Sequence, residues 1–378
     1  MRAGPPLTKI AREWLRIGTI GFGGPPTHIA LLRELCVERE GWMSAEEFED
    51  AIAATNLLPG PASTQLAIFC GWRLRGSAGA LLGGLCFIVP GLIAILLLAA
   101  VFLASSPPRW VRGAGAGAGA AVAAVAVNAA LGLVPGSWRR AVGSQQLRWI
   151  AYLVLGTAAA ATIGPWLVLV LVACGGVEVA WQRGVAGVAP ALVPVAAATV
   201  GGIGALVWVA FKVGALSYGG GFVIVPLMQA DAVSHYHWMT NEQFLNAVAL
   251  GQVTPGPVVH TVTAVGYAAR GVGGGLLAAL VAFTPSFTFV LLGARRFDRL
   301  RRDGRVRAFL DGAGPAAIGA ILGSAIPLAD ALKEGWQFAV LGAAAVALLV
   351  LRRGVVSTLL AAGAAGVILV LAGAPLPS

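Results

Sequence analysis

Two stretches of this chain interrupt an apolar segment in the same way: NLLPGPASTQ at residues 56–65 and QVTPGPVVHT at residues 252–261. Proline removes a backbone donor and ends a helix, and it also suits the first turn of the next helix. Each Pro-Gly-Pro sequence therefore predicts a helix that stops and restarts, with hydroxyl and amide side chains beside the free N–H groups of the second helix. Discontinuous helices of this kind form the substrate sites of many secondary transporters. A structural kink is the alternative, and the polar residues on both sides of the break argue against it.

The composition excludes a water-soluble protein. Of the 378 residues, 58% are hydrophobic and 11% are charged, whereas a soluble domain has about 25% charged residues. We therefore predict an all-α, polytopic integral membrane protein. Because one span needs about 20 apolar residues, the length allows roughly ten to thirteen transmembrane spans.

The chain also contains an internal repeat. Residues 16–61 align without a gap onto residues 212–257, and 14 of these 46 positions are identical. After a deletion of one residue, Arg75-Gly76 aligns with Arg270-Gly271 and Pro90 with Pro285. We predict a duplicated transmembrane unit, with an N-terminal repeat over 1–183, an apolar, proline-containing linker over 184–202 and a C-terminal repeat over 203–378.

Each repeat predicts the same series of elements. A glycine-interrupted helix is followed by a capping box, Ser44-x-x-Glu47 or Thr240-x-x-Gln243, and then by the helix that contains Pro-Gly-Pro. A long apolar span, a small-residue span and a pair of short spans complete the series. In order, the ranges are 7–35 and 203–233, 77–104 and 272–294, 113–135 and 308–332, and 149–182 and 335–373.

The net charge of +10 indicates topology, because Lys and Arg gather in cytoplasmic loops, and no nucleic-acid partner is predicted. If the N-terminus is cytoplasmic, alternating spans place Arg139, Arg140 and Arg148 inside, and Arg109 and Arg112 outside. The loop that aligns with Arg109 and Arg112 carries seven arginines over 295–307, which must be cytoplasmic. We therefore predict repeats of inverted topology, a common transporter architecture. Arg352 and Arg353 also fall inside.

Inversion requires an odd number of crossings between equivalent points, which leaves two arrangements open. Either residues 185–202 provide an extra crossing, or the Pro-Gly-Pro segments re-enter the membrane and each repeat has five spans. Crossing is favoured, because re-entry would place Arg139, Arg140 and Arg148 outside.

Two polar constellations recur in both repeats and predict a substrate site. One is a glycine cluster in the first helix and the other is the Pro-Gly-Pro break, where freed backbone N–H groups can bind an anion; close helix packing is the alternative for the glycines. His28 and His260 lie near these features and could donate to an anion or accept a proton. The predicted substrate-binding residues are Gly23, Gly24, Pro25, His28, Asn56, Pro59, Gly60, Pro61, Ser63, Thr64 and Gln65, and Gly219, Gly220, Gly221, Gln252, Thr254, Pro255, Gly256, Pro257 and His260.

Other features predict structural roles. Arg16 and Lys212 are repeat-equivalent, as are Arg75 and Arg270, and we expect these side chains to reach the membrane surface. The run Gly113–Gly119 contains GxxxG spacings that favour close helix packing. The four cysteines are dispersed, and His235 and His237 lack acidic or cysteine neighbours, so neither a metal site nor a cofactor is predicted. No nucleophile–base set is present among the spans, so we predict that the chain is not an enzyme.

These motifs resemble those of the chromate ion transporter (CHR) family in its long two-domain form, over nearly the whole chain. The resemblance is carried by seven segments. Four lie in the first repeat: Gly21–Ala30, Gly41–Met43, Asn56–Gln65 and Cys70–Arg73. Three lie in the second repeat: Gly214–Gly221, Trp238–Thr240 and Gly251–Pro257. The second repeat departs from the first at one point, since Gly221 stands where Pro25 would align. The resemblance implies a bacterial inner-membrane protein that exports chromate and confers chromate resistance.

Efflux of a dianion needs no nucleotide hydrolysis, and the chain has no nucleotide-binding motif. Moving one charge through about 100 mV is worth about 2.3 kcal/mol, so a dianion leaving a negative interior gains roughly twice that. Another oxyanion such as sulfate and a passive anion channel stay open as alternatives. Membrane lipid is an expected partner, and a homodimer stays open.

Overall fold

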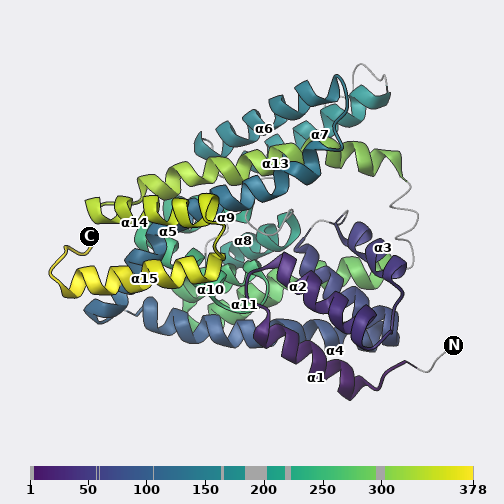
Figure 1. Cartoon of the computed structure of the whole chain (residues 1–378), viewed down its shortest axis with the longest axis horizontal. Coiled ribbons are helices and arrows are strands. Elements are labelled where there is room, and N and C mark those ends of the chain that lie inside the picture. Colours follow the sequence, from purple (N-terminus) through teal and green to yellow (C-terminus); the bar gives the residue numbers. More distant parts are fainter. Residues whose placement is uncertain are drawn as a thin grey trace. The chain divides into compact units, whose positions relative to one another are not determined.

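The computed structural model describes residues 4–56, 58, 60–104, 106–162, 166–183, 202–217, 223–294 and 303–377. Within these ranges every regular element is a helix (Figure 1), which confirms the predicted all-α class. The predicted linker lies outside the described residues except for Gly202, and so do Arg295–Arg302 of the arginine-rich loop.

Several helices are built to cross a membrane. Four of those described are long and apolar enough: α4 (Ala62–Phe102), α5 (Arg109–Trp138), the segment Val258–Gly293 and α13 (Gly304–Asp330). Shorter apolar helices cover Leu167–Gln182, Ile203–Leu216, Gly335–Val350 and Val355–Leu371. Large apolar side chains such as Leu97 and Leu280 point outward from the long helices, as expected for surfaces that face lipid. The total number of spans stays a prediction.

The helices form two compact units, and each unit draws on both predicted repeats. Unit 1 contains Met1–Ser105, Leu206–Gly221 and Leu250–Arg301, and unit 2 contains Ser106–Ala205, Phe222–Ala249 and Arg302–Ser378. In the first repeat the early part belongs to unit 1 and the later part to unit 2, whereas in the second repeat Phe222–Ala249 also belongs to unit 2.

Unit 1 is built on two long helices that pack together, α4 and α11 (Thr261–Gly293). The other helices wholly or partly in unit 1 are α1 (Leu7–Ile20), α2 (Pro25–Arg33), the π-helix η1 (Glu34–Arg39), α3 (Ala45–Thr55), α8 (Ile203–Leu216), the end of α10 (Asn241–Val253) and the short 3-10 helix η4 (Val258–His260). On the first repeat's side, the buried indole of Trp14 donates to the carbonyl of Ala67 at 2.9 Å and ties α1 to α4.

Both long helices bend sharply at aligned positions. Arg75 (φ −143°, ψ 27°) and Gly76 (φ 58°, ψ −147°) interrupt α4, and Arg270 (φ −151°, ψ 29°) and Gly271 (φ 62°, ψ −155°) interrupt α11. The left-handed φ favours glycine at the second position. Beyond each bend the chain folds back closely on itself, so that a Cβ on Gly71 would clash with the Gly79 carbonyl, and one on Gly266 with the Gly274 carbonyl. The alignment of the two repeats is thus reproduced in the backbone.

The predicted helix starts and breaks are confirmed. Ser44 and Glu47 exchange the two hydrogen bonds of a capping box at the start of α3, and Thr240 and Gln243 make the same pair at 2.9 and 3.2 Å before α10. In the first repeat α3 ends at Thr55 and α4 begins at Ala62. In the second repeat α10 ends at Val253 and η4 begins at Val258, so each Pro-Gly-Pro lies between two helices.

Unit 2 interlocks the later helices of the two repeats. Its helices are α5, α6 (Gln145–Thr162), α7 (Leu167–Arg183), α9 (Ile224–Gln229), the π-helix η3 (Ala230–His235), α13, α14 (Gly335–Ala345), the π-helix η6 (Val346–Val350) and α15 (Val355–Leu371), with most of α10. The pair α6–α7 packs on α13, whereas α14 and α15 pack on α5 (Figure 1). Each repeat therefore supplies the helix against which the other repeat's short pair packs.

Small residues make these contacts close. A Cβ on Gly319 would clash with the Leu153 carbonyl of α6, and one on Gly117 with the Ala362 carbonyl of α15. Gly113 likewise lies against Gly366, so the first GxxxG spacing packs as predicted. The second spacing has a different neighbour, because Gly115 and Gly119 lie against the side chains of Asn246 and Leu245 on α10.

Candidate functional site

The first part of the candidate site is the bend between α1 and α2. Gly23 (φ 102°) and Gly24 (φ 75°) take left-handed backbone conformations, and Pro25 then starts α2 at a position that proline favours. The bend exposes the carbonyl of Gly21. This oxygen accepts from the backbone N–H of Gly256 at 3.0 Å, which joins the first repeat's glycine cluster to the second repeat's Pro-Gly-Pro turn.

His28 is fully buried next to this bend, and both of its ring nitrogens have partners. Nε2 lies 2.8 Å from the Gly21 carbonyl oxygen and Nδ1 lies 3.3 Å from the Ser63 hydroxyl. A carbonyl can only accept, so Nε2 carries the proton and Nδ1 accepts from the hydroxyl, as in a neutral imidazole. The ring also packs edge-on against Phe87 at 5.0 Å. His28 therefore holds the bend against the start of α4.

The two Pro-Gly-Pro turns have left-handed glycines at their centres, Gly60 (φ 124°) and Gly256 (φ 95°). Each turn lies against the long helix of the other repeat. A Cβ on Gly60 would lie 3.3 Å from the Ser286 hydroxyl of α11, and a Cβ on Gly91 of α4 would clash with the Pro255 carbonyl. Gly91 and Ser286 each follow the proline that the repeats share, so the packing is reciprocal.

Unit 1 contains several buried polar atoms that lack a hydrogen-bond partner, and some of them lie at these turns. Most buried polar atoms in proteins are paired, and an unpaired one costs about 1–3 kcal/mol. In the described part of unit 1 the unpaired atoms include both ring nitrogens of His260, the amide nitrogen of Gln252, and the hydroxyls of Thr64, Ser217, Thr263 and Ser286. Each of these residues can donate at least one hydrogen bond to an anion, so the set fits an acceptor-rich ligand.

His260 differs from His28 although both rings are fully buried. Its neighbours are Gly91 and Gly256, which leave it little space, and Phe283, whose ring lies edge-on at 5.2 Å. Neither ring nitrogen makes a hydrogen bond of good geometry, and the one backbone contact of the ring is with Ile88. Of the two histidines, His260 is therefore the one held by fewer polar partners.

The structure brings most of the predicted site residues into unit 1, with different roles. Ser63 is engaged with His28, and the Thr254 hydroxyl donates to the Leu250 carbonyl at 2.9 Å. Gln65 packs over Gly60, and Pro61 and Pro257 precede the restarted helices. Asn56 is exposed at the end of α3. Pro59, Gly219, Gly220 and Gly221 lie outside the described residues.

The sequence prediction missed three hydroxyls: Ser217, Thr263 and Ser286. Ser217 stands at the edge of the second glycine cluster, where Gly21 aligns. Ser286 could have been identified from the sequence, because it directly follows the shared Pro285 and aligns with Gly91. No feature of the sequence identifies Thr263 as a site residue, since a threonine in a helix often donates to its own backbone.

The aligned cations lie away from the turns. Arg75 and Arg270 are exposed at the bends of α4 and α11, and their expected place at the membrane surface stays a prediction. Arg16, at 54% side-chain exposure, pairs with Glu13 at 3.7 Å, and the Lys212 ammonium lies 5.7 Å from the Trp208 ring centre. The described side chains around the two turns are therefore neutral donors.

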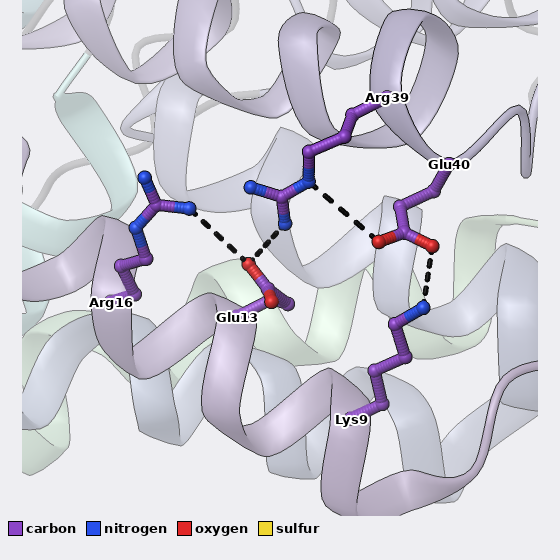
Figure 2. A network of polar contacts seen from close by, with 5 residues as sticks. All are labelled: Lys9, Glu13, Arg16, Arg39 and Glu40. Carbon is purple, nitrogen blue, oxygen red and sulfur yellow. Dashed lines mark hydrogen bonds and ion pairs between the residues drawn. The ribbon is translucent and has the colours of Figure 1, made fainter.

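Arg16 belongs to an ionic network between α1 and η1 (Figure 2). Glu13 also binds Arg39, and Lys9 donates to Glu40 at 2.5 Å. The bond from Lys9 holds the pKa of the partly buried Glu40 carboxyl below its usual value. The aligned residues of the second repeat include Ala205, Val209 and Tyr236, so this network has no counterpart there.

Comparison with known proteins supports a single family. The family model described as "Chromate transporter" matches residues 8–179 and 204–368, which lie within the two predicted repeats. The chain is 34% identical to the chromate transport protein of Cupriavidus metallidurans, over 95% of this chain and 92% of that protein. It is 29% identical to the chromate transport protein of Pseudomonas aeruginosa (96% and 92%) and 28% identical to the probable chromate transport protein of Synechococcus elongatus (85% and 84%). No solved structure matches the chain. The chain is a multi-pass membrane protein, and it belongs to the chromate transporter family.

Proposed function

We propose that this chain exports chromate across the bacterial inner membrane and thereby confers chromate resistance. The observation that carries the proposal is the group of buried, unpaired donors around the two Pro-Gly-Pro turns of unit 1. The names of the relatives supply the substrate, since three of them are chromate transport proteins or probable ones.

The donors suit an oxyanion chemically. Chromate has four oxygens that only accept hydrogen bonds, and the unpaired groups of Gln252, His260, Thr64, Thr263 and Ser286 can all donate. The restarted helices add the positive ends of their dipoles, because α4 begins directly after Pro61. A site of neutral donors binds the dianion without a fixed positive charge that would slow its release.

The direction follows from charge. A dianion that leaves a cell with a potential of about 100 mV gains roughly 4.6 kcal/mol, twice the value for one charge. In this proposal the repeats, 1–183 and 203–378, lie in opposite orientations with a cytoplasmic N-terminus and rock around the shared site. The predicted site residues outside the described part, Pro59 and Gly219–Gly221, belong to it.

One feature of unit 2 supports the inverted orientation. Arg140 of the first repeat and Asp311 of the second line the same small cavity, and Arg307 of the arginine-rich loop interacts with Asp311. Arginines that the charge pattern assigns to the cytoplasm in both repeats therefore meet at one end of the same helices. In the same cavity Glu178 is fully buried and paired with Arg148 at 2.8 Å.

Inside-out membrane vesicles test the transport. With a potential that is positive inside the vesicle, labelled chromate is expected to accumulate, to saturate with concentration and to exchange against unlabelled chromate. Accumulation of sulfate without chromate would contradict the substrate, and flux without saturation or exchange would indicate a channel. Vesicles that lack the protein are the control.

Substitution of Ser286 by alanine is expected to stabilise the substrate-free protein and to slow transport. The change removes an unpaired buried hydroxyl, so the free energy of unfolding rises by about 1 kcal/mol, while the substrate loses a donor. Ser324→Ala is the matched control: its buried hydroxyl donates to Ile321, so this variant should be less stable and transport normally. Thermal unfolding in detergent and vesicle uptake measure the two effects; a destabilised Ser286→Ala protein would show that the hydroxyl is paired.

A further inference from the structure

A groove of about 440 Å³ lies between α14 and α15 in unit 2, and none of the residues of the candidate site lines it. Its walls are almost entirely small and apolar: Val340, Ala343, Ala344, Ala347, Ala361, Ala362 and Ala365. The groove exists because α14 and α15 both pack on α5 and touch each other only weakly. Alanine side chains are too short to fill the wedge between them.

Polar groups occur at one end of the groove only. Arg353, Ser357 and Thr358 line it there, at the turn between η6 and α15. Both hydroxyls donate to the Gly354 carbonyl at 2.9 Å, whereas Arg353 is exposed and forms no ion pair with another described residue. The groove thus joins an apolar channel to a cationic end.

The turn that positions Arg353 contains a residue in an unfavourable backbone conformation. Arg352 has φ 51°, a left-handed conformation that is uncommon for a residue other than glycine. The following N–H of Arg353 donates to the Ala347 carbonyl at 2.8 Å and fixes the turn. The first turn of α15 begins at Gly354 without a side-chain cap, so its free N–H groups face the same end as the two arginines and favour an anion.

We propose that this groove binds one anionic phospholipid, with an acyl chain between α14 and α15 and the phosphate group at Arg353. The apolar walls match the chain, and the adjacent charges of Arg352 and Arg353 match the headgroup. The charge pattern also assigns this turn to the cytoplasmic side, where anionic lipids attract basic residues and where basic pockets between helices bind acidic headgroups. The lipid fills a wedge that alanines leave open and closes the contact between two weakly packed helices.

Native mass spectrometry of the full chain in detergent tests the proposal with phosphatidylglycerol and phosphatidylcholine of identical acyl chains. The wild-type protein is expected to retain one phosphatidylglycerol in preference to phosphatidylcholine. Arg353→Gln should reduce this preference about fivefold, the effect of one arginine near an anionic surface. Arg109→Gln, which removes an exposed arginine at the start of α5, is the matched control and should leave the preference unchanged.

A second pair of variants tests the apolar part. Ala361→Phe should fill the groove and abolish retention of both lipids, whereas Ala364→Phe, which places the same side chain on an exposed position of α15 outside the groove, should retain them. Equal binding of the two lipids, retention by Ala361→Phe, or displacement of the lipid by excess inorganic phosphate would overturn the proposal. A wild-type dimer that Ala361→Phe converts to a monomer would also overturn it, because a second copy of the chain would then occupy the groove.

Discussion

Replacement of His260 by leucine is expected to reduce chromate transport about 10- to 100-fold and to leave the protein folded. Neither ring nitrogen has a hydrogen bond of good geometry, and the ring's one backbone contact is with Ile88, so leucine costs the protein little stability. It does remove the one N–H donor of a neutral imidazole from the proposed site. A hydrogen bond to a charged group is worth about 1.5–3 kcal/mol, and each 1.4 kcal/mol is about a factor of ten. Chromate uptake into inside-out vesicles measures the loss.

His28→Leu provides the contrast, because it is an equally buried histidine in the same unit. Its two ring nitrogens bind Ser63 and Gly21, so this variant should lose stability, with a lower unfolding temperature in detergent. Normal uptake by His260→Leu would exclude His260 as a substrate donor. Equal losses of stability in both variants would mean that His260 has a structural role.

Gly319→Ala is expected to prevent folding. The added methyl group would overlap with the backbone carbonyl of Leu153 on α6, and a carbonyl in a helix cannot rotate away as a side chain can. The helices α6 and α13 must therefore separate, which breaks a close contact between the first repeat and the second. Detergent extraction followed by size-exclusion chromatography should yield little monodisperse protein.

Gly314→Ala, in the same helix, is the matched control. A Cβ at Gly314 meets nothing within 4 Å, and alanine favours a helix over glycine by about 1 kcal/mol. This variant should therefore be recovered at wild-type yield or better. Equal recovery of the two variants would show that α6 and α13 do not pack as closely as described.

The local features of the fold could be predicted from sequence because they depend on neighbours in the chain. Two prolines around a glycine end one helix and start the next, whereas the single prolines Pro90 and Pro285 lie inside helices. Ser44 and Thr240 cap helices through residues three positions away. The bends at Gly76 and Gly271 could be expected to match because the repeats align there, although only the structure shows that the chain folds back.

Contacts between distant segments could not be predicted. The sequence gives no sign that Gly91 faces the second Pro-Gly-Pro turn and Ser286 the first, because this depends on how α4 and α11 pack. It likewise could not distinguish the two histidines, since His28 differs from His260 only in the partners that folding brings to it. The assignment of each repeat to two different units follows from the same long-range packing.

The division of each repeat between two units has a consequence for biogenesis. Unit 1 needs residues up to Arg301 and unit 2 needs residues to the end of the chain, so unit 1 cannot close before more than half of the second repeat is made, and unit 2 cannot close before translation ends. Until then, helices of the first repeat lie in the bilayer without the second-repeat segments that pack against Gly91, Gly113 and Gly117. Contacts of such long sequence separation form slowly, and incompletely assembled chains are prone to misassembly and aggregation. Membrane quality control should therefore act on this protein mainly after translation ends, and truncation anywhere in the second repeat should lead to degradation of the whole chain.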